Sequence, residues 1–455
     1  MGRLFGTDGV RGVAISELTT DAAMLIGRAA AHIMANTDRP GKRPKILIGK
    51  DTRMSCGILE AAMTAGICSV GVDVVVLGVI PTPAVAYLTE AYGADGGIVI
   101  SASHNSFEFN GIKIFNSKGH KLSKEAEEEI ERLVFDAQDE MLPLGGTNLG
   151  RVSYEKNGEW DYIRHLLKST DVDLTGLRIV VDCANGAAYD CAKKFFSCLG
   201  AKNLVILNDS PDGTNINSGC GSTDVKGLAK AVLENKAALG IALDGDGDRC
   251  IIVDENGRPI DGDRMLAIFA KEMKKKGLLQ SNTCVVTPMT NLAFFPWAKK
   301  NGIVVSTAPY VGSGYVFERM VQDGYNLGGE QSGFIVLRDY ATTGDGLLAG
   351  AKLMELLIMS GKKMSELGQV FKPYPQVMMN VRLSESYSGD WREVKDINSI
   401  IDFCSEKLGD DGRVFVRESG TEPIIRIMVE GRDGEAVYRY ASAIAQVVRE
   451  RIGEA

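Results

Sequence analysis

Three aspartates, Asp244, Asp246 and Asp248, alternate with glycines directly after the apolar run 239–243. Glycine between each pair lets the loop curl so that the three carboxylates converge, and crowded carboxylates repel strongly unless a divalent cation neutralises them. A ligand set made only of oxygen suits Mg²⁺. We therefore expect a magnesium site at the end of this strand, with a solvated acidic turn as the alternative.

A second group of reactive side chains, Ser101, Ser103, His104 and Asn105, follows the apolar run 96–100. In α/β sheets chemistry lies just beyond the carboxyl ends of strands, so Ser103 stands where a nucleophile would act. The alternative is a simple strand-ending turn, because serine and asparagine side chains readily bond to nearby backbone.

Three further loops have residues suited to anions or sugars. Segment 5–12 is rich in glycine and carries Arg11, so its backbone and guanidinium could grip a phosphate, although a plain turn is the alternative. Glu330 and Ser332 stand between glycines, where they could hold the hydroxyls of a sugar. A nest for a phosphate dianion is expected from Arg417, Ser419, Gly420, Thr421 and Arg426.

The elements around these loops alternate as strand, loop and helix, which predicts largely parallel or mixed sheets covered by helices. Strands are expected near residues 45–49, 72–77, 96–100, 177–182, 204–207, 239–243, 284–287 and 302–306. A helix over 347–359 should begin at Asp345 as its cap. In the last helix Val437, Ala441, Ile444, Val448 and Ile452 share one face, which predicts core packing.

Length and composition limit the class of protein and its possible partners. A chain of 455 residues should divide into three or four domains. The net charge of −8 makes nucleic acid an improbable partner. Segment 22–34, the best candidate for a membrane span, is interrupted by Arg28 and His32, so we expect no membrane partner and a cytoplasmic protein. The nine cysteines are scattered without a Cys-x-x-Cys pair, which disfavours thiolate metal sites and disulfides.

The five loops together resemble the α-D-phosphohexomutase superfamily. The motifs Ser-Ala-Ser-His-Asn, Asp-Gly-Asp-Gly-Asp-Arg, Gly-Glu-Gln-Ser-Gly and Arg-x-Ser-Gly-Thr-Glu-Pro occur in this order, and the resemblance runs from Gly6 to Arg426. Within the superfamily, the opening Phe-Gly-Thr-Asp-Gly-Val-Arg-Gly and the compact length look most like the bacterial phosphoglucosamine mutases.

The resemblance implies an α/β fold of four domains around a central cleft, three of them mixed-sheet α/β domains and the last a smaller α+β domain. We expect the boundaries 1–150, 151–253, 254–368 and 369–455, which carry the phosphoserine, metal, sugar and phosphate loops in that order. The implied reaction interconverts glucosamine 6-phosphate and glucosamine 1-phosphate through a 1,6-bisphosphate. The product would feed synthesis of UDP-N-acetylglucosamine and cell-wall precursors, and a homodimer is a further expectation.

The resemblance also assigns roles to residues. Ser103 would be the phosphoserine, and one of its oxygens would join Asp244, Asp246 and Asp248 around one Mg²⁺ per subunit, with a hexose 1,6-bisphosphate as activator and intermediate. Lys113 would be the acid/base, with Arg11, His104 and Arg249 beside the transferring group. Sugar hydroxyls would be held by Glu330 and Ser332, and the other phosphate by Arg417, Ser419, Gly420, Thr421 and Arg426.

Three positions depart from the family pattern. Ser106 replaces a usual proline, Phe334 a usual histidine that faces the active site, and Gly314 a usual basic residue. Because two polar groups are then missing from the site, we expect either weakened turnover or a shifted choice of substrate.

The sequence leaves three alternatives. One is a phosphomannomutase/phosphoglucomutase acting on neutral hexose phosphates, and another is a paralogue of low activity that binds sugar phosphate and regulates a partner. A phosphatase with Asp244 as nucleophile is disfavoured, because the usual Asp-x-Asp-x-Thr motif ends in a hydroxyl where this chain has Asp248.

Overall fold

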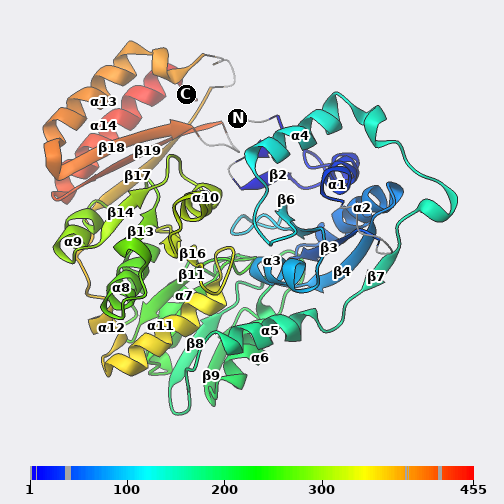
Figure 1. Ribbon diagram of the computed structural model, residues 1–455. Coiled ribbons are helices and arrows are strands. Elements are labelled where there is room, and N and C mark those ends of the chain that lie inside the picture. Colours follow the sequence, from blue (N-terminus) through cyan, green and yellow to red (C-terminus); the bar gives the residue numbers. More distant parts are fainter. Residues whose placement is uncertain are drawn as a thin grey trace. The chain divides into compact units, whose positions relative to one another are not determined.

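The computed structural model describes residues 3–6, 8–35, 43–384, 387, 389–418 and 423–454. The chain forms two compact units. The first contains Met1–Met289 and Ile303–Val370, and the second contains Thr290–Gly302 and Phe371–Ala455. Figure 1 labels many of the helices and strands of both.

The first sheet of the larger unit has seven strands in the order β1-β2-β6-β5-β3-β4-β7. Strand β5 is parallel to β3 and antiparallel to β6, so the sheet is mixed, as predicted. Because β7 pairs with β4, this sheet extends past the boundary predicted at residue 150. The strands are β1 Phe5–Gly6, β2 Gly9–Val13, β3 Lys45–Lys50, β4 Asp73–Val79, β5 Gly96–Ile100, β6 Phe109–Asn116 and β7 Val152–Tyr154.

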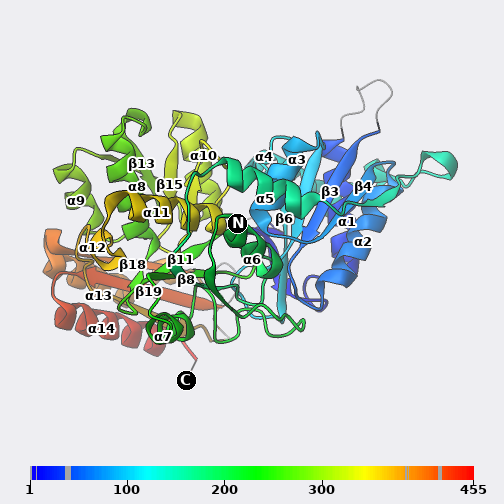
Figure 2. The same ribbon diagram turned by 90° about the horizontal axis from the view of Figure 1, so that it is seen from below.

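Helices cover both faces of this sheet, with α1 and α2 on one face and α3 on the other (Figure 2). Helix α1 begins at its cap Thr19, whose hydroxyl accepts the N–H of Ala22 at 3.1 Å. It packs closely on α2 because both carry glycine there: a Cβ at Gly66 would lie 2.1 Å from the carbonyl oxygen of Met24. The helices are α1 Thr20–Met34, α2 Cys56–Ser69, α3 Thr82–Ala91 and α4 Lys124–Phe135, followed by the 3-10 turns Gln138–Met141 and Gly146–Asn148.

The second sheet has five strands in the order β12-β11-β10-β8-β9. Strands β8, β9 and β10 are parallel and β11 returns antiparallel beside β10. All five residues of β10 are buried, which explains its continuous apolar sequence. The elements are α5 Gly158–Lys168, β8 Arg178–Asp182, α6 Tyr189–Cys198, β9 Asn203–Leu207, α7 Lys226–Glu234, β10 Leu239–Leu243, β11 Cys250–Asp254 and β12 Pro259–Ile260.

The third sheet has four strands in the order β14-β13-β15-β16. Asp345 caps α11, as predicted, by accepting the N–H of Leu348 at 2.9 Å. The elements are α8 Gly262–Lys275, the turn Gln280–Asn282, β13 Thr283–Val286, β14 Val304–Thr307, α10 Ser313–Asp323, β15 Leu327–Gly329, β16 Ile335–Leu337, α11 Gly346–Ser360 and α12 Met364–Leu367.

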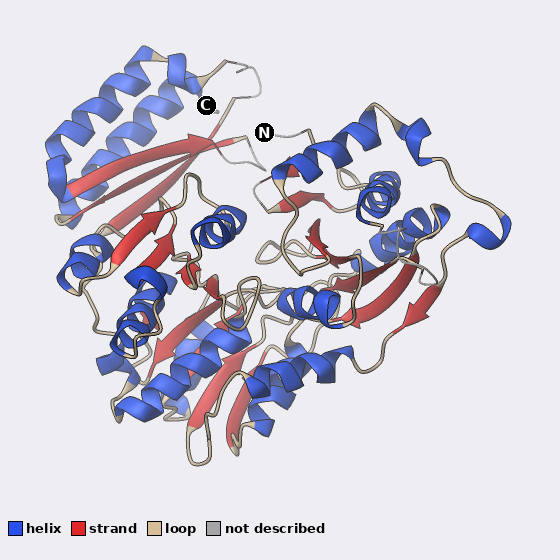
Figure 3. Ribbon diagram, in the orientation of Figure 1, coloured by secondary structure: helices blue, strands red, loops and turns tan. Residues whose placement is uncertain are grey.

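The second unit is a three-stranded antiparallel sheet, ordered β17-β19-β18, with two long helices on one face (Figure 3). The five predicted core residues of its last helix are all buried, so that prediction is confirmed. The elements are α9 Phe294–Lys300, β17 Gln376–Arg382, the turn Trp391–Glu393, α13 Lys395–Leu408, the turn Gly409–Asp411, β18 Gly412–Glu418, β19 Ile424–Gly431 and α14 Gly434–Ile452.

The predicted class, three mixed-sheet α/β domains and a smaller C-terminal α+β domain, is confirmed. Within the described ranges, every helix is too short or too polar to cross a membrane.

Candidate active site

Ser103 follows β5 and is fully buried. Its backbone is in the left-handed region, with φ 53°, which turns the side chain back toward the second sheet. The hydroxyl Oγ donates to Asp244 Oδ2 at 2.6 Å and lies 3.3 Å from His104 Nδ1. The predicted nucleophile and the predicted metal loop therefore meet, although they are 141 residues apart.

A buried ion pair after β3, between Asp51 and Arg53, supports the Ser103 loop through hydrogen bonds. Asp51 Oδ2 accepts from Ser101 Oγ at 2.5 Å and from Arg53 Nε at 2.9 Å, and Ser101 Oγ in turn accepts the Ser103 N–H. The Arg53 guanidinium, 0% exposed, donates to the backbone carbonyls of residues 103, 105, 106 and 109. The sequence analysis missed this support. Its signal was an aspartate and an arginine two residues apart at a strand end.

The three aspartates of the metal loop follow β10 and are all buried, and one ligand atom from each lies within 4.8 Å of the others. Two glycines make this possible. Gly247 has φ +72°, and a Cβ at Gly245 would lie only 2.4 Å from the carbonyl oxygen of Ser103. The predicted convergence of the carboxylates is present.

The cluster fits a divalent cation. Asp246 Oδ1 and Asp248 Oδ1 are buried and, within the described part of the chain, have no hydrogen-bond partner. Burial and the neighbouring carboxylates Asp246 and Asp248 raise the pKa of Asp244 well above its usual range. Unpartnered, mutually repelling carboxylate oxygens of this kind are what a hard cation neutralises, so the cluster is compatible with a metal site.

Lys113, on β6, lies against the same carboxylates. Its Nζ is 2.7 Å from Asp246 Oδ2, 2.8 Å from Asp248 Oδ2 and 3.3 Å from Asp8 Oδ2. Burial alone would lower the pKa of this amine, but the three carboxylates raise it well above its ordinary value, so the ammonium is charged. Asp246 is also fixed by Thr82, whose hydroxyl donates to Oδ2 at 2.6 Å.

Arg11 is carried by a β-hairpin rather than by the loop expected over 5–12, because β1 and β2 pair antiparallel there. Its Nη2 donates to Asp8 Oδ2 at 2.8 Å and its Nη1 to Asn105 Oδ1 at 3.2 Å. Asp8 also forms an ion pair with Lys121, so cationic side chains from several segments of the chain surround this carboxylate. The sequence analysis did not single out Asp8.

His104 and Arg249 flank Ser103. Arg249 Nη1 lies 3.2 Å from His104 Nδ1, and its backbone N–H donates to Asp244 Oδ1 at 3.1 Å. Burial and the positive charges of Arg249 and Arg11 lower the pKa of His104 to about 3, so its imidazole is neutral. The Nε atoms of Arg249 and Arg11 are buried and make no hydrogen bond to a described residue, although Arg249 Nε lies 3.7 Å from Asp248 Oδ1 in an ion pair, so both could donate to a bound anion.

The predicted sugar loop lies beside the metal loop. Cys250 N–H donates to the carbonyl of Gly333 at 3.1 Å, and Arg249 forms a β-bridge with Phe334. Ser332 Oγ donates to Glu330 Oε2 at 3.0 Å, whereas Glu330 Oε1 is buried without a partner in the described chain. Glu330 thus has a free acceptor near the metal loop.

The three residues that depart from the family pattern have different surroundings. Phe334 is 1% exposed and packs in an apolar cluster with Val316 and Met320, so its ring is part of a core. Gly314 lies in the first turn of α10, and a side chain there would extend into open space. Ser106 is exposed, and its carbonyl accepts from Arg53.

The predicted phosphate nest belongs to the second unit. Arg417 and Arg426 stand opposite each other on β18 and β19, which places two cations side by side. Ser419, Gly420 and Thr421 fall outside the described residues. The role of all five stays a prediction.

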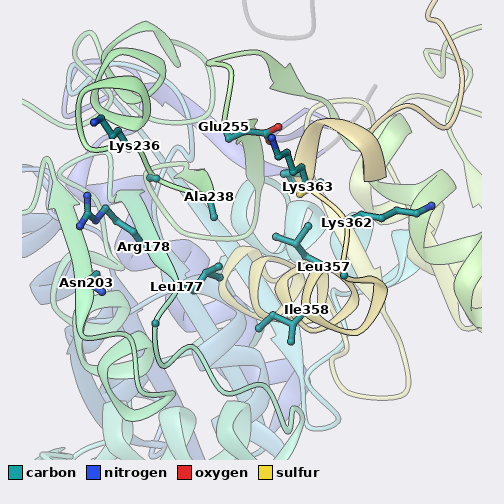
Figure 4. Close-up of a pocket in the computed structure, with 14 residues that line it drawn as sticks. Leu177, Arg178, Asn203, Lys236, Ala238, Glu255, Leu357, Ile358, Lys362 and Lys363 are labelled. Carbon is teal, nitrogen blue, oxygen red and sulfur yellow. The ribbon is translucent and has the colours of Figure 1, made fainter.

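A cavity of about 700 Å³ lies elsewhere (Figure 4). Arg178, Asn203 and Ala238 line it at the amino ends of β8, β9 and β10, whereas the metal loop follows the carboxyl end of β10. It is therefore at the opposite edge of the second sheet from Ser103, and we do not assign the reaction to it.

Four family models match the chain in order. Domains I, II and III and the C-terminal domain of phosphoglucomutase/phosphomannomutase match residues 2–141, 160–257, 261–374 and 378–447. The phosphoglucosamine mutase of Acetivibrio thermocellus is 47% identical over 454 residues, with 100% of both chains covered. That of Clostridioides difficile is 46% identical over 453 residues, covering 99% of this chain and 100% of the relative.

Solved structures agree on the fold. A phosphoglucomutase/phosphomannomutase family protein from Burkholderia thailandensis has a TM-score of 0.79 at 24% identity, with 99% of each chain covered. The N-acetylphosphoglucosamine mutase of Aspergillus fumigatus, solved with GlcNAc-6P and magnesium, has a TM-score of 0.68 at 17% identity, covering 99% of this chain and 96% of that one.

Fold and site together define a phosphohexomutase, an isomerase that moves a phosphoryl group within a hexose. The chain belongs to the phosphoglucomutase/phosphomannomutase family and, within it, to the phosphoglucosamine mutases.

Proposed function

We propose that this protein interconverts glucosamine 6-phosphate and glucosamine 1-phosphate through a phosphorylated Ser103 and a hexose 1,6-bisphosphate. The observation that carries the proposal is the contact between Ser103 Oγ and Asp244 Oδ2 at 2.6 Å, inside a cluster of buried carboxylates that also holds Lys113. A bare serine hydroxyl is a weak nucleophile, whereas a phosphoserine can donate its phosphoryl group and be restored.

The cycle has two transfers. In the first, the bond between phosphorus and Ser103 Oγ breaks and Oγ takes a proton, while a bond from phosphorus to O1 of the sugar forms and O1 gives up its proton. In the second, the bond between phosphorus and O6 breaks and O6 takes a proton, while Ser103 Oγ gives up its proton and is phosphorylated again. Lys113 supplies both proton steps: its ammonium donates to the departing oxygen, and the resulting amine accepts from the attacking hydroxyl.

Other side chains hold the transferring group and the sugar. The spare Nε donors of Arg11 and Arg249 are suited to phosphoryl oxygens. Neutral His104 adds no charge to the site, which suits a hydrogen-bonding role. The free Glu330 Oε1 and the Ser332 hydroxyl suit the sugar, and an acidic partner such as Glu330 favours an amino sugar.

Asp244, Asp246 and Asp248 would hold Mg²⁺, together with an oxygen of the phosphorylated Ser103. When bound, the ion neutralises charge on the transferring phosphoryl group. The nest of Arg417, Ser419, Gly420, Thr421 and Arg426 would hold the phosphate that is not reacting. Since either phosphate must occupy this nest in turn, the bisphosphate has to be accepted in two orientations.

The test is a coupled assay for glucosamine 1-phosphate, with glucosamine 6-phosphate, Mg²⁺ and a trace of the 1,6-bisphosphate. We expect turnover by the wild type, loss of at least about 1,000-fold in Ser103→Ala, and no loss in Ser106→Ala, which removes an exposed hydroxyl from the same loop. Chelation should stop turnover and added Mg²⁺ should restore it.

The substrate is tested in the same assay with the 6-phosphates of N-acetylglucosamine, glucose and mannose. A higher kcat/KM for a neutral hexose phosphate would replace the proposed substrate but keep the mechanism. If folded, phosphorylated protein turned over none of these sugars, the proposal would fail, and a regulatory sugar-phosphate-binding protein would take its place. The domain boundaries and the homodimer stay predictions, and sedimentation would measure the latter.

A further inference from the structure

The side-chain amide of Asn217 joins the two loops that carry the chemistry. Its Nδ2 donates to the carbonyl oxygens of Ser103 and Asn105, both at 2.9 Å. Asn217 lies between β9 and β10 of the second sheet, whereas the two carbonyls belong to the loop after β5 of the first. Nothing in the sequence analysis pointed to this residue.

The same two carbonyls each receive a second donor. Arg53 Nη2 lies 3.0 Å from the carbonyl oxygen of Ser103 and 2.8 Å from that of Asn105. A carbonyl oxygen can accept two hydrogen bonds, so both acceptors are fully used. One donor to each carbonyl comes from the first sheet's domain and the other from the domain that carries the metal loop.

The hydrogen bonds from Asn217 and Arg53 hold the Ser103 backbone in a conformation that it would not otherwise keep. Ser103 has φ 53°, a conformation that costs energy for any residue with a Cβ, and it persists only where the surroundings impose it. The same conformation aims Oγ at Asp244. The hydrogen bonds to the Ser103 carbonyl therefore fix the direction of the reacting oxygen.

Asn217 itself is fixed to the domain of the metal loop. Its backbone N–H donates to the carbonyl of Ala184 at 2.9 Å. A Cβ at Gly245, beside Asp244, would lie 2.8 Å from Asn217 Nδ2 and 2.4 Å from the Ser103 carbonyl oxygen. Only glycine leaves room for the amide, the carbonyl and the metal loop to meet.

We propose that Asn217 is a positioning residue for phosphoryl transfer. Its amide keeps the Ser103 carbonyl, and through it Ser103 Oγ, in register with Asp244 while the phosphoryl group moves. Asn217 acts through Ser103 and touches neither the sugar nor the phosphoryl group. The inference rests on the phosphoserine mechanism proposed above, and it adds a residue to that mechanism.

The backbone conformation of Asn217 decides which substitutions can test its side-chain amide. Asn217 has φ 59°, so alanine would add backbone strain to the loss of the amide. Aspartate and glycine tolerate this conformation better. Asn217→Asp keeps the shape but turns an acceptor toward two carbonyl oxygens, and Asn217→Gly removes the side chain altogether. Ser218→Ala, at the exposed next residue, is the matched control.

The measurement is kcat and KM, together with the single-turnover rate of phosphoryl transfer from isolated phosphoenzyme to sugar. For Asn217→Asp we expect kcat and the single-turnover rate to fall about 10- to 100-fold, as small misplacements of a reacting group do, with KM within about threefold of the wild type. Asn217→Gly should lose less, because it introduces no repulsion. Ser218→Ala should match the wild type.

Rates are counted per phosphorylated Ser103, measured by intact mass, so that unfolded protein does not enter the comparison. A single-turnover rate of Asn217→Asp within about twofold of the wild type would overturn the inference. So would a loss confined to KM, since that would indicate contact with the sugar. Inactive wild-type protein would instead refute the proposed function, and the two failures are thus distinguishable.

Discussion

Replacing Arg53 by methionine should strongly destabilise the first domain. The Arg53 side chain and its partner Asp51 are both 0% exposed, and their ion pair measures 2.9 Å between Nε and Oδ2. Methionine keeps most of the apolar volume but removes the charge and every donor. The Asp51 carboxylate then stays buried next to Ser101 without its cation.

The expected loss of stability follows from the burial of this ion pair. Removing one partner of a buried ion pair costs about 3–5 kcal/mol, because the remaining charge is left uncompensated. This range already contains the lost hydrogen bonds to the carbonyls of 103, 105, 106 and 109. Whole domains are stable by about 5–15 kcal/mol, so one substitution would remove a large part of the total.

The assay is calorimetry of Arg53→Met beside Arg132→Met. Arg132 also pairs with carboxylates, Glu129 and Glu140, but its side chain is 42% exposed, so solvent screens these pairs and they contribute little to stability. For a domain of this size about 1 kcal/mol shifts Tm by about 2–4 °C, so Arg53→Met should lower the first transition by about 6–20 °C. The control should lower it by no more than about 4 °C.

A double-mutant cycle separates the ion pair from simple loss of packing. Asp51→Asn in the Arg53→Met background removes the orphaned charge, so the pair of changes should cost at least about 2 kcal/mol less than the sum of the single changes. Equal losses of stability in Arg53→Met and Arg132→Met, or strict additivity in the cycle, would refute the reasoning.

Three more perturbations test other parts of the site. Thr82→Val removes the hydroxyl that donates to Asp246 Oδ2, and the loss of a hydrogen bond that orients a metal-binding carboxylate should lower metal affinity about 10-fold or more, measured by titration of activity with Mg²⁺. Phe334→His puts a polar ring in an apolar cluster and should cost about 2–4 kcal/mol without raising kcat/KM, as denaturation and hexose-phosphate kinetics would show. Burial raises the pKa of Asp345 to about 6, so the folded state holds an extra proton there and the contribution of Asp345 to stability should fall between about pH 4 and 6 as pH rises. Asp345→Asn should flatten that fall in chemical denaturation followed across this range.

The loops that carry the reactive residues were predictable because each lies at the end of a strand. An apolar run that stops in Ser103 or in Asp244 indicates a buried strand and the start of a loop, and the carboxyl ends of strands are where such loops lie. Lys113, by contrast, was assigned through the family resemblance. On β6 it is simply an alternate residue of a strand, and periodicity gives no reason to aim it at the carboxylates.

The supporting contacts could not be predicted. Thr82 and Asp246 are 164 residues apart, and Asn217 and Ser103 are 114 apart. Nothing local distinguishes these residues from other polar residues in loops, because their roles arise only when two sheets meet. Arg53 is intermediate, since an aspartate two residues away could have indicated a local ion pair, but not the carbonyls that Arg53 supports.

One interpretation changed for a local reason, and a second stays a prediction. The glycines of segment 5–12 indicated a loop, but two short strands pair there, and Gly9, at φ +79°, provides the tight turn that brings them together. At position 334 the family comparison indicated a polar group missing from the site. The phenylalanine is buried against apolar side chains, and Lys121, which pairs with Asp8, lies 5.8 Å from the centre of its ring, so the effect on turnover or substrate choice stays a prediction.

The charges of the site explain why phosphorylation of Ser103 and metal binding should be coupled. The carboxylates of Asp246 and Asp248 share the single ammonium of Lys113, and burial together with these two carboxylates raises the pKa of Asp244 beside Ser103. A phosphoserine at position 103 would add a charge of about −1.5 to −2 next to these three carboxylates. A divalent cation held by the three aspartates would offset this charge and would weaken the hold of the carboxylates on Lys113. Because linkage is reciprocal, the phosphoryl group that needs the cation must also tighten its binding by the same factor.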